Sequence, residues 1–169
     1  MSGQRQLDPE GLGDHIDRLY RAAWGLCGSR EEAEDLVQET FARVLRKPRL
    51  IRSEDDLAYL LRALRNTFFS SRRAAARRVQ PTLLGDDLEQ VADAAPPGHA
   101  ERLDTTELYA AIAELPPDFR DALVAIDLVG LSYREASRAL RVREATVTTR
   151  LHRARRRLAD ALAGERAPR

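Results

Sequence analysis

The sequence predicts an all-α protein in which two small helical domains are joined by a flexible acidic linker. Apolar residues make up 43% of the chain and aromatic residues only 5%, a composition that favours helical cores over sheets. Apolar side chains recur every three or four positions through most of the chain, which is the period of a helix. This period fails between residues 79 and 103, where proline, glycine and acidic residues gather as in a linker.

The first predicted domain, residues 8–78, contains three helices after a disordered lead. Its first helix ends at Cys27, with Trp24 beside the apolar stripe and therefore expected in the core. Ser29 caps the second helix, which ends before Pro48 because the residue preceding proline is disfavoured in a helix. A loop at residues 49–52 leads into a third helix, whose buried stripe is predicted to consist of Leu57, Leu60, Leu61, Leu64 and Phe68.

The second predicted domain, residues 104–163, ends in a helix-turn-helix. A pair of prolines opens one of its helices, where a missing amide costs nothing. Ser132 and Glu135 have the spacing of a capping box and mark the start of a short helix. A turn at residues 141–143 then leads to a longer, basic helix. Its apolar stripe is Val147, Leu151, Ala154, Leu158 and Leu162.

Charge is segregated along the chain, although the net charge is only +1. Residues 29–39 carry five acidic side chains and one arginine, residues 62–78 carry six arginines and no acid, and residues 141–157 carry seven arginines and one glutamate. Patches of opposite sign indicate separate partners. We expect nucleic acid at the basic patches and a basic protein surface at the acidic one.

The basic patches have the side chains that nucleic-acid recognition requires. Arginine forks reach guanine edges or phosphates, and threonine reaches a phosphate or a thymine methyl, so the last helix is predicted to read a major groove. The third helix combines arginines with Tyr59, Asn66 and Phe69, which fits a surface that grips phosphates and stacks an unpaired base. The alternative for either helix is a solvated basic face.

Other classes of site are not indicated by the sequence. Cys27 is the only cysteine, so no disulfide is expected, and no cluster of cysteine and histidine has the spacing of a metal site. No nucleophile–base pair or phosphate-binding glycine loop is present, so we expect no catalytic residues and no cofactor. Without an apolar run long enough for a signal peptide or a membrane span, a cytoplasmic protein with no membrane insertion is expected.

Two separated motifs resemble one family. AEDLVQETF (33–41) and LLRALRN (60–66) are similar to the second conserved region of sigma-70-family RNA polymerase sigma factors. LPPDFRDAL (115–123), GLSYREAS (130–137) and ATVTTRLHRARRRL (145–158) resemble their fourth region. Both regions in this order, with no third region between them, are typical of the small extracytoplasmic-function (ECF) group.

The resemblance implies an alternative sigma factor that binds core RNA polymerase and directs promoter-specific transcription initiation. It implies docking on the clamp helices of the largest polymerase subunit through Asp35, Gln38 and Glu39. It implies binding of the melted minus-ten element through the loop 49–56 and through Arg62, Arg65, Asn66, Arg72 and Arg73. It implies reading of the minus-thirty-five element through Arg143, Thr146, Thr148, Thr149, Arg150 and Arg153. Further implied partners are promoter DNA, the flap of the second-largest polymerase subunit and a cognate anti-sigma factor.

The sequence departs from the family pattern at a few positions. Arg141 stands in the turn where the family usually has a glycine, and Ser70 stands where an aspartate is common. Ala145 and Thr148 replace a common glycine and lysine, so the promoter preference should differ from that of typical members. The acidic linker is similar to family linkers that thread the polymerase cleft, and we expect it to contact the basic domains in the free protein.

Three other readings remain open from the sequence. An ordinary helix-turn-helix regulator would bind DNA without polymerase, but it leaves the acidic face and the arginine-rich third helix unexplained. A helical enzyme is disfavoured by the scattered histidines, His15, His99 and His152. A sigma-like adaptor would bind polymerase without opening promoters.

Overall fold

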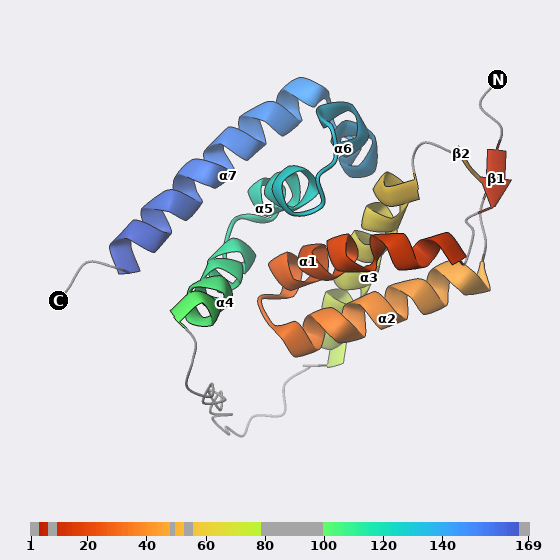
Figure 1. Ribbon diagram of the computed structural model, residues 1–169, viewed down its shortest axis with the longest axis horizontal. Helices are drawn as coiled ribbons and strands as arrows, with labels where there is room; N and C mark the ends of the chain where they lie inside the picture. Colours follow the sequence, from red (N-terminus) through yellow and green to blue (C-terminus); the bar gives the residue numbers. More distant parts are fainter. Residues whose placement is uncertain (1–3, 7–9, 48–49, 53–55, 79–99, 166–169) are drawn as a thin grey trace.

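The computed structural model describes residues 4–6, 10–47, 50–52, 56–78 and 100–165, and these residues confirm the predicted all-α class (Figure 1). A 3₁₀ helix, Glu10–His15, precedes the first α-helix. The α-helices are α1 (Ile16–Cys27), α2 (Arg30–Arg46), α3 (Asp56–Arg78), α4 (Ala100–Ala113), α5 (Pro117–Leu123), α6 (Tyr133–Leu140) and α7 (Glu144–Glu165). A π-helical segment, Val124–Leu128, continues from the end of α5.

The N-terminal domain is built from α1, α2 and α3, which pack on one another. The apolar stripes predicted for these helices form its core, and Leu19, Leu60 and Leu64 are at most 1% exposed. Trp24 lies in the core as predicted. Gly28 ends α1 in the left-handed conformation (φ 78°), which glycine adopts without steric cost. The predicted cap at Ser29 is present, since its hydroxyl accepts a hydrogen bond from the amide of Glu32 at 3.4 Å.

Two short strands lie outside the predicted elements. Strand β1 (Gln4–Gln6) pairs with β2 (Leu50–Arg52) in antiparallel register, with Gln4 opposite Arg52. The predictions of a disordered lead over residues 1–7 and of a loop at residues 49–52 are therefore wrong where these strands lie. Neither strand can be predicted from the sequence, because a strand of three residues is too short to show an alternating pattern.

The C-terminal domain contains α4 to α7, and α4 begins at Ala100. Pro117 occupies the first turn of α5, as the sequence predicts. The capping box of α6 is complete: the amide of Glu135 donates to the Ser132 hydroxyl at 3.3 Å, and the Ser132 amide donates to the Glu135 carboxylate at 2.7 Å. The Glu135 carboxylate also accepts a hydrogen bond from the Ser132 hydroxyl at 2.7 Å, and the bonds from this hydroxyl and from the Ser132 amide lower the pKa of Glu135.

The turn between α6 and α7 keeps the geometry of a glycine turn. Arg141 has φ 56° and ψ 43°, and no other non-glycine residue among those described has a positive φ. A left-handed conformation costs a residue with a Cβ about 1–2 kcal/mol. The substitution of arginine for glycine therefore changes the energy of the turn but not its shape. Val142, in the same turn, is half-buried against the core.

Three large apolar residues that continue the helical period of the sequence are exposed. Ile16 is 45% exposed, Leu45 48% and Tyr133 41%. Ile16 and Tyr133 begin their helices and Leu45 lies in the last turn of its helix. At a helix end the stripe extends beyond the neighbouring helix, so the period of the sequence continues where the packing has stopped.

The two domains pack against each other. Helix α1 lies against α4 and the π-helical segment, and α3 lies against α6 (Figure 1). The Trp24 ring stacks on Tyr109 of α4 with 3.9 Å between centroids and 1° between planes. A methyl group added at Gly25 would lie 2.6 Å from Cδ1 of Leu128, so the helix backbone itself approaches the other domain. We call this packing the closed arrangement. The predicted contact of the acidic linker lies outside the described residues.

Candidate functional site

The predicted reading helix presents its polar face to solvent. Its stripe residues Val147, Leu151 and Ala154 are at most 2% exposed, so the helix is fixed to its domain from one side. On the other side Thr148 and Thr149 are exposed, and each hydroxyl donates to a helix carbonyl four residues earlier at 3.0 Å. Because the hydroxyl proton is directed at the helix, each threonine side chain presents a lone pair of its oxygen and its methyl group to a partner.

Four further predicted reading residues lie on this helix or directly before it. Arg143 and Arg153 are exposed and Thr146 is half-exposed. Arg150 is held from within the domain: its Nη2 lies 2.6 Å from Oδ2 of Asp118, with the arginine side chain 26% exposed and the aspartate 64%. The structure therefore places the predicted reading residues on one helix and its N-terminal approach, with one arginine positioned by a carboxylate.

A second arginine of this helix is fixed in the same way. Arg155 makes two hydrogen bonds to Asp127, at 3.0 Å and 2.6 Å, and the pair raises the pKa of the arginine. Arg157 lies over the Phe119 ring at 5.3 Å. The basic run is thus divided between arginines that fasten the helix to its own domain and arginines that remain exposed.

The predicted minus-ten residues lie along α3, four of them accessible. Asn66, Arg72 and Arg73 are exposed, and Arg62 is half-buried over the Tyr59 ring at 5.8 Å. Arg72 lies over the Phe68 ring at 5.2 Å, with Nη2 3.8 Å from the Glu32 carboxylate. The side chains of the predicted base-capturing loop, residues 49–56, lie outside the described residues except for Asp56, and Leu50–Arg52 form a strand.

Arg65 differs from the other minus-ten candidates because the C-terminal domain covers it. Its guanidinium forms an ion pair with Asp121 of α5, and the side chains are 18% and 5% exposed. The Arg65 guanidinium also lies over the Phe69 ring at 5.6 Å. Arg120, the neighbour of Asp121, lies over Phe68 at 5.3 Å, and burial lowers its pKa.

A basic cleft of about 310 Å³ lies between α2, α3 and the turn at Arg141. It is lined by residues of both domains, none of them acidic: Arg43, Val44, Lys47, Tyr59, Arg62, Ala63, Asn66, Thr67, Ser70 and Arg141. Because Arg141 belongs to the turn of the helix-turn-helix, the cleft joins the predicted minus-ten surface to the turn that precedes the reading helix.

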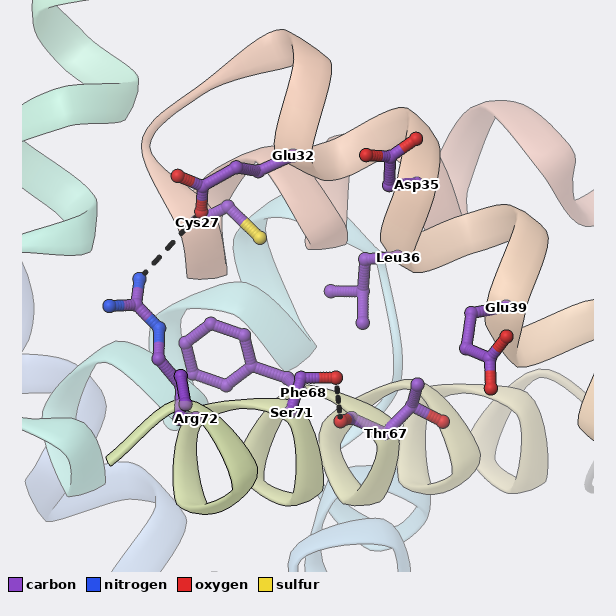
Figure 2. Close-up of a pocket in the computed structure, with 10 residues that line it drawn as sticks. Cys27, Glu32, Asp35, Leu36, Glu39, Thr67, Phe68, Ser71 and Arg72 are labelled. Carbon is purple, nitrogen blue, oxygen red and sulfur yellow. Dashed lines mark hydrogen bonds and ion pairs between the residues drawn. The ribbon is translucent and has the colours of Figure 1, made fainter. Parts of the chain in front are cut away.

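The predicted docking residues Asp35, Gln38 and Glu39 are all exposed on α2. Glu39 accepts a hydrogen bond from Arg43 at 2.7 Å. Asp35 and Glu39 border a pocket of about 420 Å³ between α2 and α3. Figure 2 shows these carboxylates on the α2 side, the apolar side chains of Leu36 and Phe68 between the helices, and Arg72 reaching toward Glu32.

Cys27 lies in the same pocket (Figure 2). Burial, reinforced by the nearby Glu32 carboxylate, raises the pKa of its thiol to about 12. The group is therefore a neutral thiol at physiological pH, and it contributes to the apolar part of the pocket. The pocket thus combines an apolar interior with an acidic border.

The sequence analysis did not predict the three aspartates that hold arginines of α3 and α7 in place. Asp118, Asp121 and Asp127 each hold an arginine that lies between 28 and 56 residues away in the chain. No local pattern links such residues.

Two kinds of feature are absent from the described part of the chain. No helix there is both long and apolar enough to cross a membrane. Within the same ranges, no group of three or more histidine, cysteine, aspartate or glutamate side chains is placed to hold a metal ion.

Comparison with known proteins gives matches over both domains. Residues 12–78 match the family model of sigma-70 region 2, and residues 105–158 match that of sigma-70 region 4. The ECF RNA polymerase sigma factor SigE of Mycolicibacterium smegmatis is 39% identical over 153 residues, which are 88% of this chain and 59% of SigE. The chain thus spans less than two thirds of the length of that relative.

Two further relatives are matched over most of their length. EcfG of Rhodopseudomonas palustris, also an ECF RNA polymerase sigma factor, is 33% identical over 148 residues, covering 87% of this chain and 80% of EcfG. The sigma factor RpoE of Bartonella quintana, crystallised with the anti-sigma factor NepR, superposes with a TM-score of 0.74 at 28% identity. That match covers 93% of this chain and 97% of RpoE.

Proposed function

This chain belongs to the ECF group of sigma-70-family RNA polymerase sigma factors, and we propose that it binds core RNA polymerase and directs promoter-specific transcription initiation. The observation that carries the proposal is the presence, in one chain, of an exposed acidic face on α2 and an exposed threonine and arginine face on α7. A regulator that acts without polymerase has no use for the first face.

The N-terminal domain docks on polymerase through Asp35, Gln38 and Glu39. Their partner is the clamp helices of the largest subunit, and the pocket between α2 and α3 receives an apolar side chain of that partner. The acidic border of the pocket supports a basic partner surface, and the neutral Cys27 thiol supports an apolar contact inside it. The C-terminal domain contacts the flap of the second-largest subunit.

The C-terminal domain reads the minus-thirty-five element in the major groove through α7 and the turn before it. The reading residues are Arg143, Thr146, Thr148, Thr149, Arg150 and Arg153. Their support is the one-sided burial of α7, which leaves these side chains on its accessible face. Asp118 limits the rotamers of Arg150, so less side-chain entropy is lost when the arginine binds a base.

The N-terminal domain holds the melted minus-ten strand along α3. Arg62, Arg65, Arg72 and Arg73 bind phosphates, and Asn66 contacts a base edge. Stacking of one base on an aromatic ring contributes about 1–3 kcal/mol, which is comparable to the few kcal/mol needed to unstack it. One such contact balances one flipped base, so polymerase must supply the remaining free energy of opening.

Run-off transcription with purified core polymerase and a library of genomic promoters tests the proposal. Transcripts that start at a defined subset of promoters only when the chain is added are expected. Tight sequence-specific duplex binding by the isolated chain, with no transcript, would establish the ordinary regulator instead. Core binding without any transcript would establish the sigma-like adaptor.

Strand opening is tested separately by replacing Asn66 with alanine. Asn66 is exposed and its side chain has no described partner, so the fold should be unaffected. Core docking and upstream recognition should remain, while permanganate reactivity of thymines in the minus-ten region should be lost. Normal thymine reactivity in the variant would remove Asn66 from the site.

An anti-sigma factor is proposed as a further partner. The similar RpoE chain was crystallised with NepR, an anti-sigma factor. A partner of this kind must compete with core polymerase, and this competition is the test: increasing amounts of core enzyme should displace it from the chain.

A further inference from the structure

The contact between Arg65 and Asp121 places a carboxylate on a guanidinium that is proposed to bind DNA. The two residues come from different domains, α3 and α5, and both are largely buried. Arginine binds carboxylate and phosphate with the same planar fork. In the closed arrangement, Asp121 therefore occupies a position on Arg65 that a phosphate of the bound strand would require.

Apolar contacts hold the two domains in this position. Trp24 and Tyr109 stack in parallel, and the backbone of α1 at Gly25 contacts Leu128 and Val124. On the side of the N-terminal domain, these apolar contacts involve α1, whereas the ion pair involves α3. The junction therefore has an apolar part and a charged part that can be altered separately.

The charged part of the junction is incompletely satisfied. Nε of Arg65, Nε of Arg120 and Oδ1 of Asp121 are buried without a hydrogen-bond partner. A buried polar group without a partner carries a desolvation penalty, and an incompletely satisfied network gains little over its separated parts. The closed arrangement is thus held by apolar contacts and opposed by part of its polar chemistry, as expected of a junction that opens.

Promoter geometry requires that it open. The minus-ten and minus-thirty-five elements are about 25 base pairs apart, or roughly 85 Å at a rise of about 3.4 Å per base pair. In the closed arrangement Asn66 of the minus-ten surface and Arg141 of the helix-turn-helix line one cleft. A chain in this state cannot contact both elements along one promoter.

We propose that Asp121 is an internal competitor of DNA for Arg65, so that the closed arrangement withholds the strand-binding surface until the domains separate. The inference rests on the proposed function, because it takes Arg65 to be a DNA contact. It names the C-terminal domain of the same chain as the partner that covers this surface.

The substitution Asp121→Asn tests the inference with the full chain and no polymerase. The variant keeps the shape of the side chain and removes its charge. Affinity for a short, mixed-sequence single-stranded DNA, measured by fluorescence anisotropy, should rise about threefold to tenfold, and the radius of gyration from small-angle X-ray scattering should increase. Asp160→Asn is the matched control, because it changes the net charge equally at an exposed position of α7.

A second variant, Tyr109→Ala, opens the junction from its apolar part without altering either charge, and it serves where Asp121→Asn does not fold. It should also bind the single strand more tightly and be less compact. Equal affinity and equal size for wild type and a folded variant of either kind would overturn the inference. A gain equal to that of Asp160→Asn would overturn it too, since net charge alone would explain it.

These outcomes are distinguishable from a failure of the proposed function. If Asp121→Asn binds the strand more tightly but the chain supports no transcription with core polymerase, the inference stands and the proposed function fails. If the chain directs transcription but the variant behaves as wild type, the proposed function stands and the inference fails.

Discussion

Individual arginines of this protein have different roles although they belong to the same basic runs. Arg150 is held by Asp118, Arg155 by Asp127 and Arg65 by Asp121, whereas Arg153 and Arg73 are exposed. A carboxylate partner fixes the direction of a guanidinium, and it must be displaced where a phosphate is to bind in its place. The consequence of losing an arginine therefore depends on its partner.

Arg150 is predicted to contribute specificity. Arg150→Ala should weaken binding of the C-terminal domain to its duplex site by about 1–3 kcal/mol if the fork contacts a guanine, and should relax selectivity at one base pair. Binding to a set of duplexes that differ at single positions, in complex with polymerase, measures both effects. An equal loss on every duplex would identify Arg150 as a phosphate contact. Arg134→Ala, at an exposed position of α6, is the control and should change neither.

At the scale of the element, local signals position the helices that carry the site. The capping box of Ser132 and Glu135 fixes the start of α6, and through it the turn that orients α7. Loss of an N-cap hydroxyl costs about 1 kcal/mol. This contribution is small beside core burial, but it acts where the direction of the chain is set.

Stability at acid pH should depend on this cap. The pKa of Glu135 is lowered by its bonds to Ser132, so its contribution is complete above the unfolded-state pKa of about 4.3 and is lost as pH falls through the lowered folded-state pKa. Ser132→Ala should lower the free energy of unfolding by about 1 kcal/mol at neutral pH and by less at about pH 3. Thermal unfolding at the two pH values measures the difference. Glu107→Gln, at an exposed position on α4, is the control and should leave the difference in stability between the two pH values unchanged. An equal effect of Ser132→Ala at both pH values would contradict the role of Glu135.

The acidic face of α2 is predicted to be the docking element. The double variant Asp35→Lys, Glu39→Lys should weaken binding to core polymerase by tenfold or more with no loss of helix content, because both side chains are exposed. The pair Glu31→Lys, Glu34→Lys makes the same charge change on the same helix away from the pocket, and it should bind nearly as wild type. Unchanged affinity of the first variant would exclude this docking face.

Cys27 provides an independent test of docking at α2, because it is the only cysteine of the chain and lies in the pocket between α2 and α3. If a polymerase side chain enters the pocket, modification of Cys27 by a maleimide should be slower in the complex than in the free chain. Mass spectrometry of the chain after labelling measures the rates. Equal rates, with docking intact, would show that the partner does not cover the pocket.

At the scale of the whole molecule, the closed arrangement depends on a glycine. The backbone of α1 approaches the C-terminal domain at Gly25, where even a Cβ would meet Leu128 and Val124. Glycine inside a helix costs about 0.8–1.0 kcal/mol relative to alanine. The presence of Gly25 in the last turn of α1 is explained by the neighbouring domain and not by the helix.

Gly25→Leu should therefore separate the domains while leaving the N-terminal domain folded, since the substitution favours the helix itself. Small-angle scattering should show a larger particle, and amide exchange of the C-terminal domain should be faster where it faces α1. Gly13→Leu, at a position with open space around it, is the control. A particle of unchanged size would show that Leu128 moves aside and the junction persists.

The sequence by itself determined the helices and their caps, the two helical regions and the side chains that form each polar face. These features depend on residues three or four positions apart in the chain. Such residues are neighbours within one helix, so the features do not require tertiary contacts. The same reasoning went wrong at helix ends, where Ile16, Leu45 and Tyr133 continue a stripe past the limit of packing. It also missed β1 and β2, whose pairing joins residues 4–6 to 50–52.

Only the tertiary structure decided which polar residues are accessible. Arg62 and Arg65 are alike in sequence context, yet Arg65 faces Asp121, which lies 56 positions away in the chain. Asp118 likewise reaches Arg150 across 32 positions. The partner of a charged side chain depends on how two helices or two domains meet. That meeting is set by apolar packing between surfaces such as those of Trp24 and Tyr109, which no local pattern specifies.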